Sequence, residues 1–432
     1  MLNFLGKRQP FCDGVSRRNF LQIGAFGAGL SLADMLRARA AEPALDPLPR
    51  TKQKSVVMIY LPGGPSHIDM YDLKPDAPAE FRGEFKPIQT NVTGVQISEH
   101  FPMQARMWDK LSVVRSIVAN DEHSDSYVMT GFTEQVNRAA TGGQHPSIGS
   151  VVSKTRSGAN NDVPPFVSLR GMDIGTEPGF LGIAHRPFTA QGPGIGNLGR
   201  ASGTNDEIMG NRQDLLGKFD NVRREIDASG TMKGMDGFTA RAFDMIASGV
   251  VRNALDLKKE DVRTRDRYKG VEQFLTTRRL IEAGVGCVTL SYGGWDTHSS
   301  NFKTLKQQLP VLDRGIANLI QDFHDRGMED DVITVVWGEF GRTPKINSSE
   351  AGRDHWSPVM SAMIAGGGLK MGQAVGSSSA RAEYPKDRPY KVPHVLSTVY
   401  HALGIDPSQT FNNGAGRPMY ILEDRNRVEE LI

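Results

Sequence analysis

Six short apolar runs, each bounded by glycine, proline or polar residues, limit what this chain can fold into. They are too short for buried helices and rich in β-branched residues, so they predict buried strands. The runs are 55–61, 111–117, 165–169, 286–292, 332–337 and 359–365. Segments with helical periodicity lie between several of them. Strands that alternate with helices predict an α/β fold with a mostly parallel sheet covered by helices on both faces.

The clearest helix is expected over 305–326, where apolar residues recur on one face. That face contains Leu309, Leu312, Ile316, Leu319, Ile320 and Phe323. Further helices are expected near 148–154, within 214–283 and over 392–403, and loops over 171–210. We therefore expect residues 55–432 to form a single domain, with 41–54 as a linker rich in proline and charge.

Residues 1–40 differ from the rest of the chain. Arg17 and Arg18 precede a mildly apolar, glycine-rich run at 23–33, and Ala38-Arg39-Ala40 offers a cleavage site with small residues. This arrangement resembles a twin-arginine signal peptide. It predicts export by the twin-arginine machinery to the periplasm or the cell exterior. An ordinary amphipathic helix or a retained N-terminal anchor are the alternatives.

Charge and cysteine content narrow the classes of partner. The full chain has a formal net charge of +2, and removing residues 1–40, with six basic and two acidic residues, leaves about −2. A mature chain without a basic excess is not expected to bind nucleic acid. Cys287 is the one cysteine after residue 40, so no internal disulfide can form. After residue 50 no apolar run is long enough to span a bilayer.

Possible metal ligands follow two of the expected strands. Asp296 and His298 come two residues apart after Gly293-Gly294, just past the run at 286–292. Alternate side chains on an extended or turn backbone share a face, so both can reach one ion. Glu339 ends the run at 332–337, where a buried carboxylate needs either a metal or Arg342 as its partner. A capping aspartate with a surface histidine is the alternative for the first pair.

His355 lies between Asp354 and Trp356, just before the last apolar run. An adjacent carboxylate fixes the tautomer of a metal-binding imidazole, so we expect Asp354 to serve His355 in this way. A core histidine bonded to backbone remains the alternative.

Two more segments carry candidate groups at strand ends. His67 and Asp69 repeat the two-residue spacing after the first strand. His123, Ser124 and Ser126 follow the second strand. A serine beside a metal can act as a nucleophile, although capping of the following helix is an equally good explanation.

The order of these motifs resembles the alkaline phosphatase and sulfatase superfamily. More closely, the chain is similar to an exported family, domain of unknown function 1501, over nearly all of 50–410. The motifs that carry this resemblance are Leu61-Pro62-Gly63-Gly64-Pro65-Ser66-His67, Gly293-Gly294-Trp295-Asp296-Thr297-His298, Gly338-Glu339-Phe340-Gly341-Arg342-Thr343-Pro344 and Gly352-Arg353-Asp354-His355-Trp356. The resemblance implies a three-layer alkaline-phosphatase-like sandwich.

The resemblance also implies a divalent metal site (Zn, Mn, Ca or Mg). Asp296, His298 and His355 map onto its first ion. Glu339, with His67 or Asp69, would hold a second ion or orient water, and His123 is a further candidate ligand of that second site. This chain has Gly63-Gly64 and Phe340 where the phosphatases have an aspartate and a histidine, which weakens the second site.

The resemblance makes a metal-dependent hydrolase of phosphate or sulfate esters the leading hypothesis. Arg342 or Arg353 would clamp the anionic group, and Ser124, Ser126 or water would attack. The substrate would be a small-molecule or glycan ester. The rival hypotheses are a non-catalytic, metal-stabilised envelope or glycan-binding protein and a structural envelope protein with a degenerate site.

Overall fold

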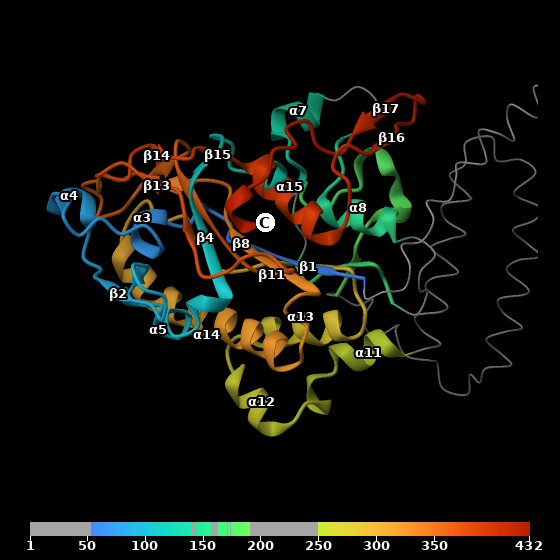
Figure 1. The fold of residues 1–432 in the computed structure, drawn as a ribbon, viewed down its shortest axis with the longest axis horizontal. Coiled ribbons are helices and arrows are strands. Elements are labelled where there is room, and N and C mark those ends of the chain that lie inside the picture. The colour runs from blue at the N-terminus through green and yellow to red at the C-terminus, as the bar shows by residue number, and fades with distance from the viewer. Residues whose placement is uncertain (1–52, 140–143, 157–162, 171, 173, 191–248) are drawn as a thin grey trace, which may run out of the picture. The chain divides into compact units, whose positions relative to one another are not determined.

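The computed structural model describes residues 53–139, 144–156, 163–170, 172, 174–190 and 249–432. These residues form a nine-stranded sheet with the order β12-β4-β11-β8-β1-β7-β5-β6, in which β15 also pairs with β4 (Figure 1). The expected signal peptide, most of the linker and part of the expected loops and helices at 171–248 lie outside the described residues, and they stay predictions.

All six predicted strands are present in the sheet. They are β1 (Ser55–Tyr60), β4 (Leu111–Val118), β5 (Phe166–Ser168), β7 (Cys287–Ser291), β8 (Val332–Trp337) and β11 (Met360–Gly366). The remaining strands, β6 (Phe188–Thr189), β12 (Ala374–Val375) and β15 (Tyr390–Lys391), are short and lie at or near the edges. The central strands β8, β1, β7 and β5 run parallel, which confirms the expected fold class.

The central strand β1 shows why the sheet is covered on both faces. Its residues are 0–7% exposed, and successive side chains enter two different cores. Val57 and Ile59 belong to one apolar cluster, and Val56 and Met58 belong to the other. A strand buried on both sides requires a layer of helices on each face.

The helices supply those two layers (Figure 1). Residues of α5 (Pro102–Ala105), α11 (Val250–Leu255), α13 (Glu272–Glu282) and α14 (Asn301–Asp325) pack in the cluster that contains Val57. Residues of α6 (Ser126–Thr130), α8 (Ile148–Thr155) and α15 (Val392–Leu403) pack in the cluster that contains Val56. Shorter helices are α3 (His67–Met70), α4 (Ala79–Arg82), α7 (Glu134–Ala139) and α12 (Val262–Arg267).

Strand β11 departs from the parallel arrangement. It pairs antiparallel with both of its neighbours, β4 and β8. Its first residue therefore lies at the edge where β4 and β8 end. This reversal brings the segment before β11, which contains His355, to the same edge as the segments that follow β4, β7 and β8.

The described residues also form four two-stranded sheets that are separate from the main sheet. They are β2 (Pro87–Gln89) with β3 (Gln96–Ser98), β9 (Gly341–Arg342) with β10 (His355–Trp356), β13 (Ser377–Ser378) with β14 (Pro385–Asp387), and β16 (Thr410–Asn412) with β17 (Pro418–Tyr420). The β9–β10 pair sets Arg342 opposite His355. It thereby fixes the histidine against the loop after β8.

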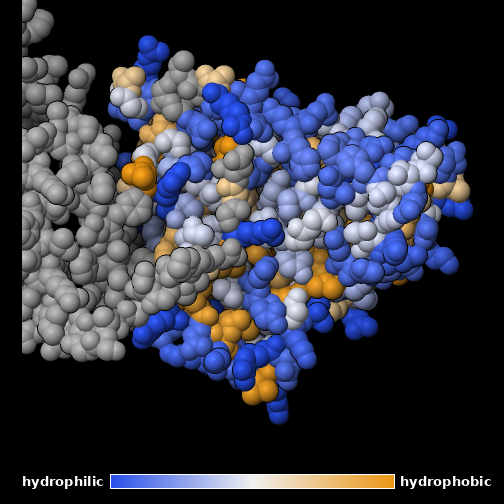
Figure 2. Space-filling model, turned by 180° about the vertical axis from the view of Figure 1, so that it is seen from behind, coloured by the Kyte–Doolittle hydropathy of each residue, from blue (hydrophilic) through white to orange (hydrophobic). Residues whose placement is uncertain are grey.

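Hydrophilic residues occupy most of the face in Figure 2. Within the described part of the chain, no helix has the length and apolar character needed to cross a membrane.

Two buried histidines predict a loss of stability in acid. Burial lowers the pKa of His67 and of His145 to about 4, from the usual 6.5. Between these values the unfolded chain binds protons that the folded chain does not. The free energy of unfolding should therefore be highest above pH 6.5. It should fall by about 3 kcal/mol for each histidine as the pH drops to 4.

Urea unfolding at pH 7 and pH 4.5 measures this effect. His145→Phe should reduce the difference between the two pH values, because a phenyl ring keeps the stacking on Phe132 and cannot take up a proton. An unchanged pH dependence in His145→Phe would contradict the assignment of this histidine as a neutral buried group.

Candidate metal centre

Four segments that are far apart in sequence meet at one edge of the sheet. Asp296 and His298 follow β7, Glu339 follows β8, and His123 follows β4. His355 belongs to β10, just before the antiparallel strand β11. The carboxyl ends of strands in open α/β sheets are where ligands bind, and these residues lie at such an edge.

Three ligand-type atoms form a small triangle. Asp296 Oδ1, His298 Nε2 and His355 Nε2 lie 3.1 Å from one another in each pair. Ligand atoms bound tetrahedrally to one Zn²⁺ lie about 3.3–3.6 Å apart, since each bond is about 2.0–2.2 Å. The triangle therefore has almost the size that a single ion requires.

The carboxylate behind His298 supports the same interpretation. His298 Nδ1 contacts Asp354 Oδ1 at 2.7 Å, and the hydrogen bond to His298 holds the pKa of Asp354 below its usual range. When the ring proton is on Nδ1, facing Asp354, the Nε2 lone pair of His298 points toward the oxygen of Asp296. Lone pairs that face one another repel unless a cation lies between them. A divalent ion thus fits the donor set.

The role of Asp354 differs from the sequence expectation. We expected it to orient the neighbouring His355, whereas its carboxylate contacts His298, 56 positions away. Asn347 donates to both Asp354 oxygens, at 3.2 and 3.3 Å, and to the carbonyl of His298 at 2.9 Å. Sequence reasoning missed Asn347, because it lies in an irregular loop without a motif.

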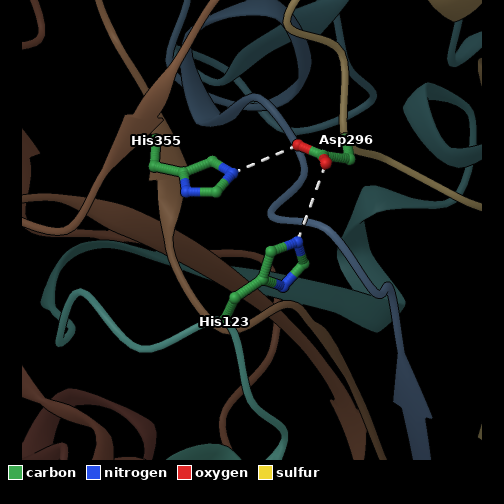
Figure 3. Close-up of side chains that lie close together, drawn as sticks. All are labelled: His123, Asp296 and His355. Carbon is green, nitrogen blue, oxygen red and sulfur yellow. Dashed lines mark hydrogen bonds and ion pairs between the residues drawn. The ribbon is translucent and has the colours of Figure 1, made fainter.

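His123 approaches the other oxygen of Asp296. Its Nε2 lies 3.7 Å from Asp296 Oδ2, and ligand atoms of His123, Asp296 and His355 all lie within 4.8 Å of one another (Figure 3). The opposite ring nitrogen, Nδ1, is 2.8 Å from Glu339 Oε1. Hydrogen bonding to Glu339 raises the pKa of His123. His123 therefore repeats the arrangement of His298, with a carboxylate behind the ring and Nε2 toward Asp296.

Glu339 lies behind His123, and its expected role as a direct ligand stays a prediction. The side chain is completely buried, and its two oxygens accept hydrogen bonds from the backbone amides of Gly63 (2.8 Å) and Gly64 (3.2 Å). With His123 as a further donor, its lone pairs are largely occupied. Glu339 orients a histidine and the loop after β1, in the manner of the outer carboxylates of metal sites.

The loop after β1 requires glycine at its closest point. Gly63 has φ of +99°, and a Cβ atom there would lie 2.5 Å from the backbone nitrogen of Asp296. The position that carries an aspartate in the resembling phosphatases is thus filled here by backbone packed against Asp296. Any side chain at residue 63 would displace the proposed ligand.

Arg342 forms hydrogen bonds within the protein, and its expected role as an anion clamp stays a prediction. The side chain is fully buried, and Nη2 lies 2.5 Å from Asp296 Oδ1. The other nitrogens donate to the carbonyls of Gly64 and Arg353, at 2.8 and 3.0 Å. Burial raises the pKa of Asp296, but the hydrogen bond and the charge of Arg342 outweigh it and lower the value to about 2. Arg342 thus keeps Asp296 ionised and in place.

Arg353 and Asp69 form a second buried unit apart from the triangle. Asp69 Oδ2 and Oδ1 accept bonds from Arg353 Nε (2.8 Å) and Nη2 (3.0 Å), and both side chains are 0% exposed. Ser66 and Asn301 also donate to Asp69 Oδ2. Asp69 therefore supplies no ligand to the group at the sheet edge, and Arg353 has no free donor edge for a substrate anion.

His67 is likewise absent from the group. It is buried, and Nε2 contacts the carbonyl of Ala382 at 3.1 Å. Its Nδ1 has no hydrogen-bond partner among the described residues. The expectation that His67 or Asp69 compensates for the missing aspartate is not supported by this geometry.

The two serines differ in what they can do. Ser126 is fully buried and donates to the carbonyl of Phe132, so it is a structural residue. Ser124 is 6% exposed and accepts a hydrogen bond from the amide of Ser126 at 3.2 Å. Ser124 thus serves the turn into α6, and its expected role as a nucleophile stays a prediction.

Phe340 packs against both histidines at the back of the site. Its ring centroid lies 4.4 Å from that of His355 and 5.5 Å from that of His123. The ring is 1% exposed. Residue 340 is therefore an apolar ring in this chain. The resembling phosphatases carry a histidine ligand at this position.

Glu339→Gln should weaken metal binding about 10- to 100-fold, the usual cost of losing an outer-shell carboxylate. The amide keeps the size of the side chain but removes the charge that orients His123. Titration of the metal-free protein with Zn²⁺ and Mn²⁺ measures this change. Glu80→Gln, at an exposed position, is the matched control. Wild-type affinity in Glu339→Gln would contradict the positioning role.

The side chains of the site are open enough for a ligand. Those of Asp296 and His298 are 45% and 48% exposed in the described structure. The ion-binding atoms are therefore within reach of a dissolved metal and of a substrate.

Comparison with known proteins identifies the family. The family described as "Protein of unknown function (DUF1501)" matches residues 53–432, and the chain belongs to it. No curated protein matches the sequence significantly. The family expected from the four motifs is thereby confirmed.

Solved structures with similar folds share little sequence with this chain. The crystal structure of Ps i-CgsB in complex with k-i-k-neocarrahexaose is 11% identical, with a TM-score of 0.37, over 82% of this chain and 73% of that one. The lipoteichoic acid synthase LtaP from Listeria monocytogenes is also 11% identical, with a TM-score of 0.34, over 88% of this chain and 77% of that one.

Proposed function

We propose that this member of the DUF1501 family is an exported, metal-dependent hydrolase of phosphate or sulfate esters. The observation that carries the proposal is the triangle of Asp296 Oδ1, His298 Nε2 and His355 Nε2, with 3.1 Å between each pair of atoms. Carboxylate and imidazole ligands of this kind suit Zn²⁺ and related divalent ions.

The proposal assigns a metal-binding or a positioning role to each residue of the site. Asp296, His298 and His355 hold the ion, and His123 lies close enough to add a fourth ligand or to contact the substrate. A divalent ion at this position supplies Lewis acidity toward an ester oxygen. Asp354 and Glu339 keep the protons of His298 and His123 on Nδ1, so that both Nε2 atoms face the ion. Arg342 keeps Asp296 ionised.

The second candidate is a non-catalytic protein that the metal stabilises. It is favoured by the burial of Arg342 and Arg353, since neither guanidinium is free to bind the anionic group of a substrate. In such a protein the metal would join the loops after β4 and β7 to β10. A hydrolase with this site must bind the anion through the ion and His123 instead.

The experiment that separates the two combines metal analysis with turnover. The full-length exported protein is assayed with aryl phosphates and aryl sulfates before and after treatment with a chelator. Turnover that disappears with the metal and returns on reloading supports the hydrolase, and bound metal without any turnover supports the second candidate. Ser124→Ala, tested in parallel, should retain most of the activity if water attacks and lose all of it if Ser124 attacks.

Export is proposed from the sequence of residues 1–40. Replacing both Arg17 and Arg18 with lysine should leave the precursor in the cytoplasm, because the pair is the recognition element of a twin-arginine signal. Cell fractionation followed by immunoblotting measures the distribution. Arg37→Lys/Arg39→Lys makes the same chemical change outside the pair and should be exported normally. Normal export of the Arg17→Lys/Arg18→Lys protein would point to another route.

A further inference from the structure

A pocket lies on the loop that leads into the metal centre. It has a volume of about 310 Å³, and the residues that define its chemistry are Arg170, Gln273, Tyr292, Trp295, Gln307 and Gln308. Gly293, which also lines it, is three residues before Asp296, so their Cα atoms are at most about 11 Å apart. The pocket therefore lies close to the metal site along the chain.

One residue of the pocket, Gln308, carries a buried acceptor without a partner. Gln308 Nε2 donates to the carbonyl of Gly294 at 2.9 Å, which fixes the orientation of the amide. Its Oε1 is buried and has no hydrogen-bond partner in the described structure. An unpaired buried acceptor is unfavourable. A hydroxyl or N–H donor of a ligand reaches this oxygen when the Gln308 side chain turns toward the pocket, and that movement gives the acceptor a partner.

The other lining groups limit the kind of ligand. Gln273 and Gln307 are exposed amides that can both donate and accept, as pairs of hydroxyl groups do. Tyr292 adds a partly exposed aromatic ring, which packs edge-on against Phe274. None of the described residues around the pocket is acidic, and Arg170 is its one basic residue. The volume lies at the lower limit of small-molecule sites, which suits a single ring.

We infer that this pocket binds the hydroxylated, uncharged part of the ester, a single sugar ring, beside the metal centre. The inference rests on the proposed function for the identity of the whole substrate but not for sugar binding itself. The amides of Gln307 and Gln308 contact hydroxyl groups, and the face of Tyr292 contacts the ring.

Binding of neutral sugars to the full-length protein tests the inference without any need for catalysis. The probes are D-galactose, D-glucose and N-acetyl-D-glucosamine, followed by calorimetry or ligand-observed NMR. Gln308→Leu should weaken binding about tenfold, because it removes one buried hydrogen bond. Gln307→Ala leaves the bond to Gly294 intact and should also weaken binding. Gln321→Leu makes the same exchange further along α14 and should bind like the wild type.

The outcomes separate this inference from the proposed function. Sugar binding that depends on Gln308, in a protein that hydrolyses no ester, supports the inference while the proposed function fails. Hydrolysis of aryl esters, with sugar binding absent or equal in Gln308→Leu and wild type, overturns the inference alone. Binding of adenosine or uridine in preference to the sugars also overturns it, because the pocket would then recognise a nucleobase.

Discussion

His298→Ala and His355→Ala should each remove most of the bound metal and, with it, any ester hydrolysis. Each change deletes one corner of the triangle in which Nε2 lies 3.1 Å from Asp296 Oδ1. Losing an outer-shell partner already costs about 10- to 100-fold in affinity, so losing a direct ligand should cost more than about 100-fold. Metal content after exhaustive dialysis and titration with Zn²⁺ and Mn²⁺ measure the effect.

The controls for this experiment come from the same chain. His324→Ala changes an exposed histidine on α14 and should leave the metal content unchanged. His123→Ala should cost less than the other two, because its Nε2 lies 3.7 Å from Asp296 rather than 3.1 Å. Full metal occupancy in both His298→Ala and His355→Ala would show that the triangle is not the binding site.

The stoichiometry should be one tightly bound ion per chain. Phe340 puts an apolar ring where a second histidine would be needed, and Asp69 is held by Arg353. Two ions bound with equal affinity would mean that Glu339 leaves its backbone donors to become a ligand. The amides of Gly63 and Gly64 would then lose their acceptor, which makes that arrangement unfavourable.

The sequence was sufficient to predict the central strands and the gathering of Asp296, His298, Glu339 and His355. Those strands are buried on both faces, so each appears as an uninterrupted apolar run with a glycine or polar residue at its end. The glycines also mark the loops that bend back over the sheet edge. Both features are local, and local features can be recognised without knowing the fold.

The pairing of side chains could not be predicted in the same way. Asp354 is next to His355 in sequence but contacts His298, because β10 pairs with β9 and turns the two neighbouring side chains in different directions. Arg353 was expected to bind substrate, yet it contacts Asp69, which is 284 residues away. A single sequence gives the chemistry of a charged residue, whereas its partner depends on tertiary contacts.

Arg353→Met should destabilise the fold by about 3–5 kcal/mol, the usual cost of leaving one member of a buried ion pair uncompensated. Methionine preserves much of the volume of the side chain, so the loss reports on charge and hydrogen bonding more than on packing. Arg353 also donates to the carbonyls of Thr343, Pro344 and Phe81, which would lose their donor. Urea unfolding followed by circular dichroism measures the change.

Adding Asp69→Asn to Arg353→Met should restore a large part of that stability. The double variant no longer buries a lone carboxylate, and the new amide keeps an oxygen that can accept the hydrogen bonds from Ser66 and Asn301. The double-mutant cycle then gives the coupling between the two residues, which is large for groups in direct contact.

An anion clamp would behave differently, since a residue that binds substrate contributes to KM and little to folding. If Arg353→Met has wild-type stability and a raised KM for esters, Arg353 binds the substrate, as the sequence predicted. Strong coupling with Asp69 would instead show that the arginine holds the loop before His355 against α3, and that the metal centre depends on this buried pair for its position.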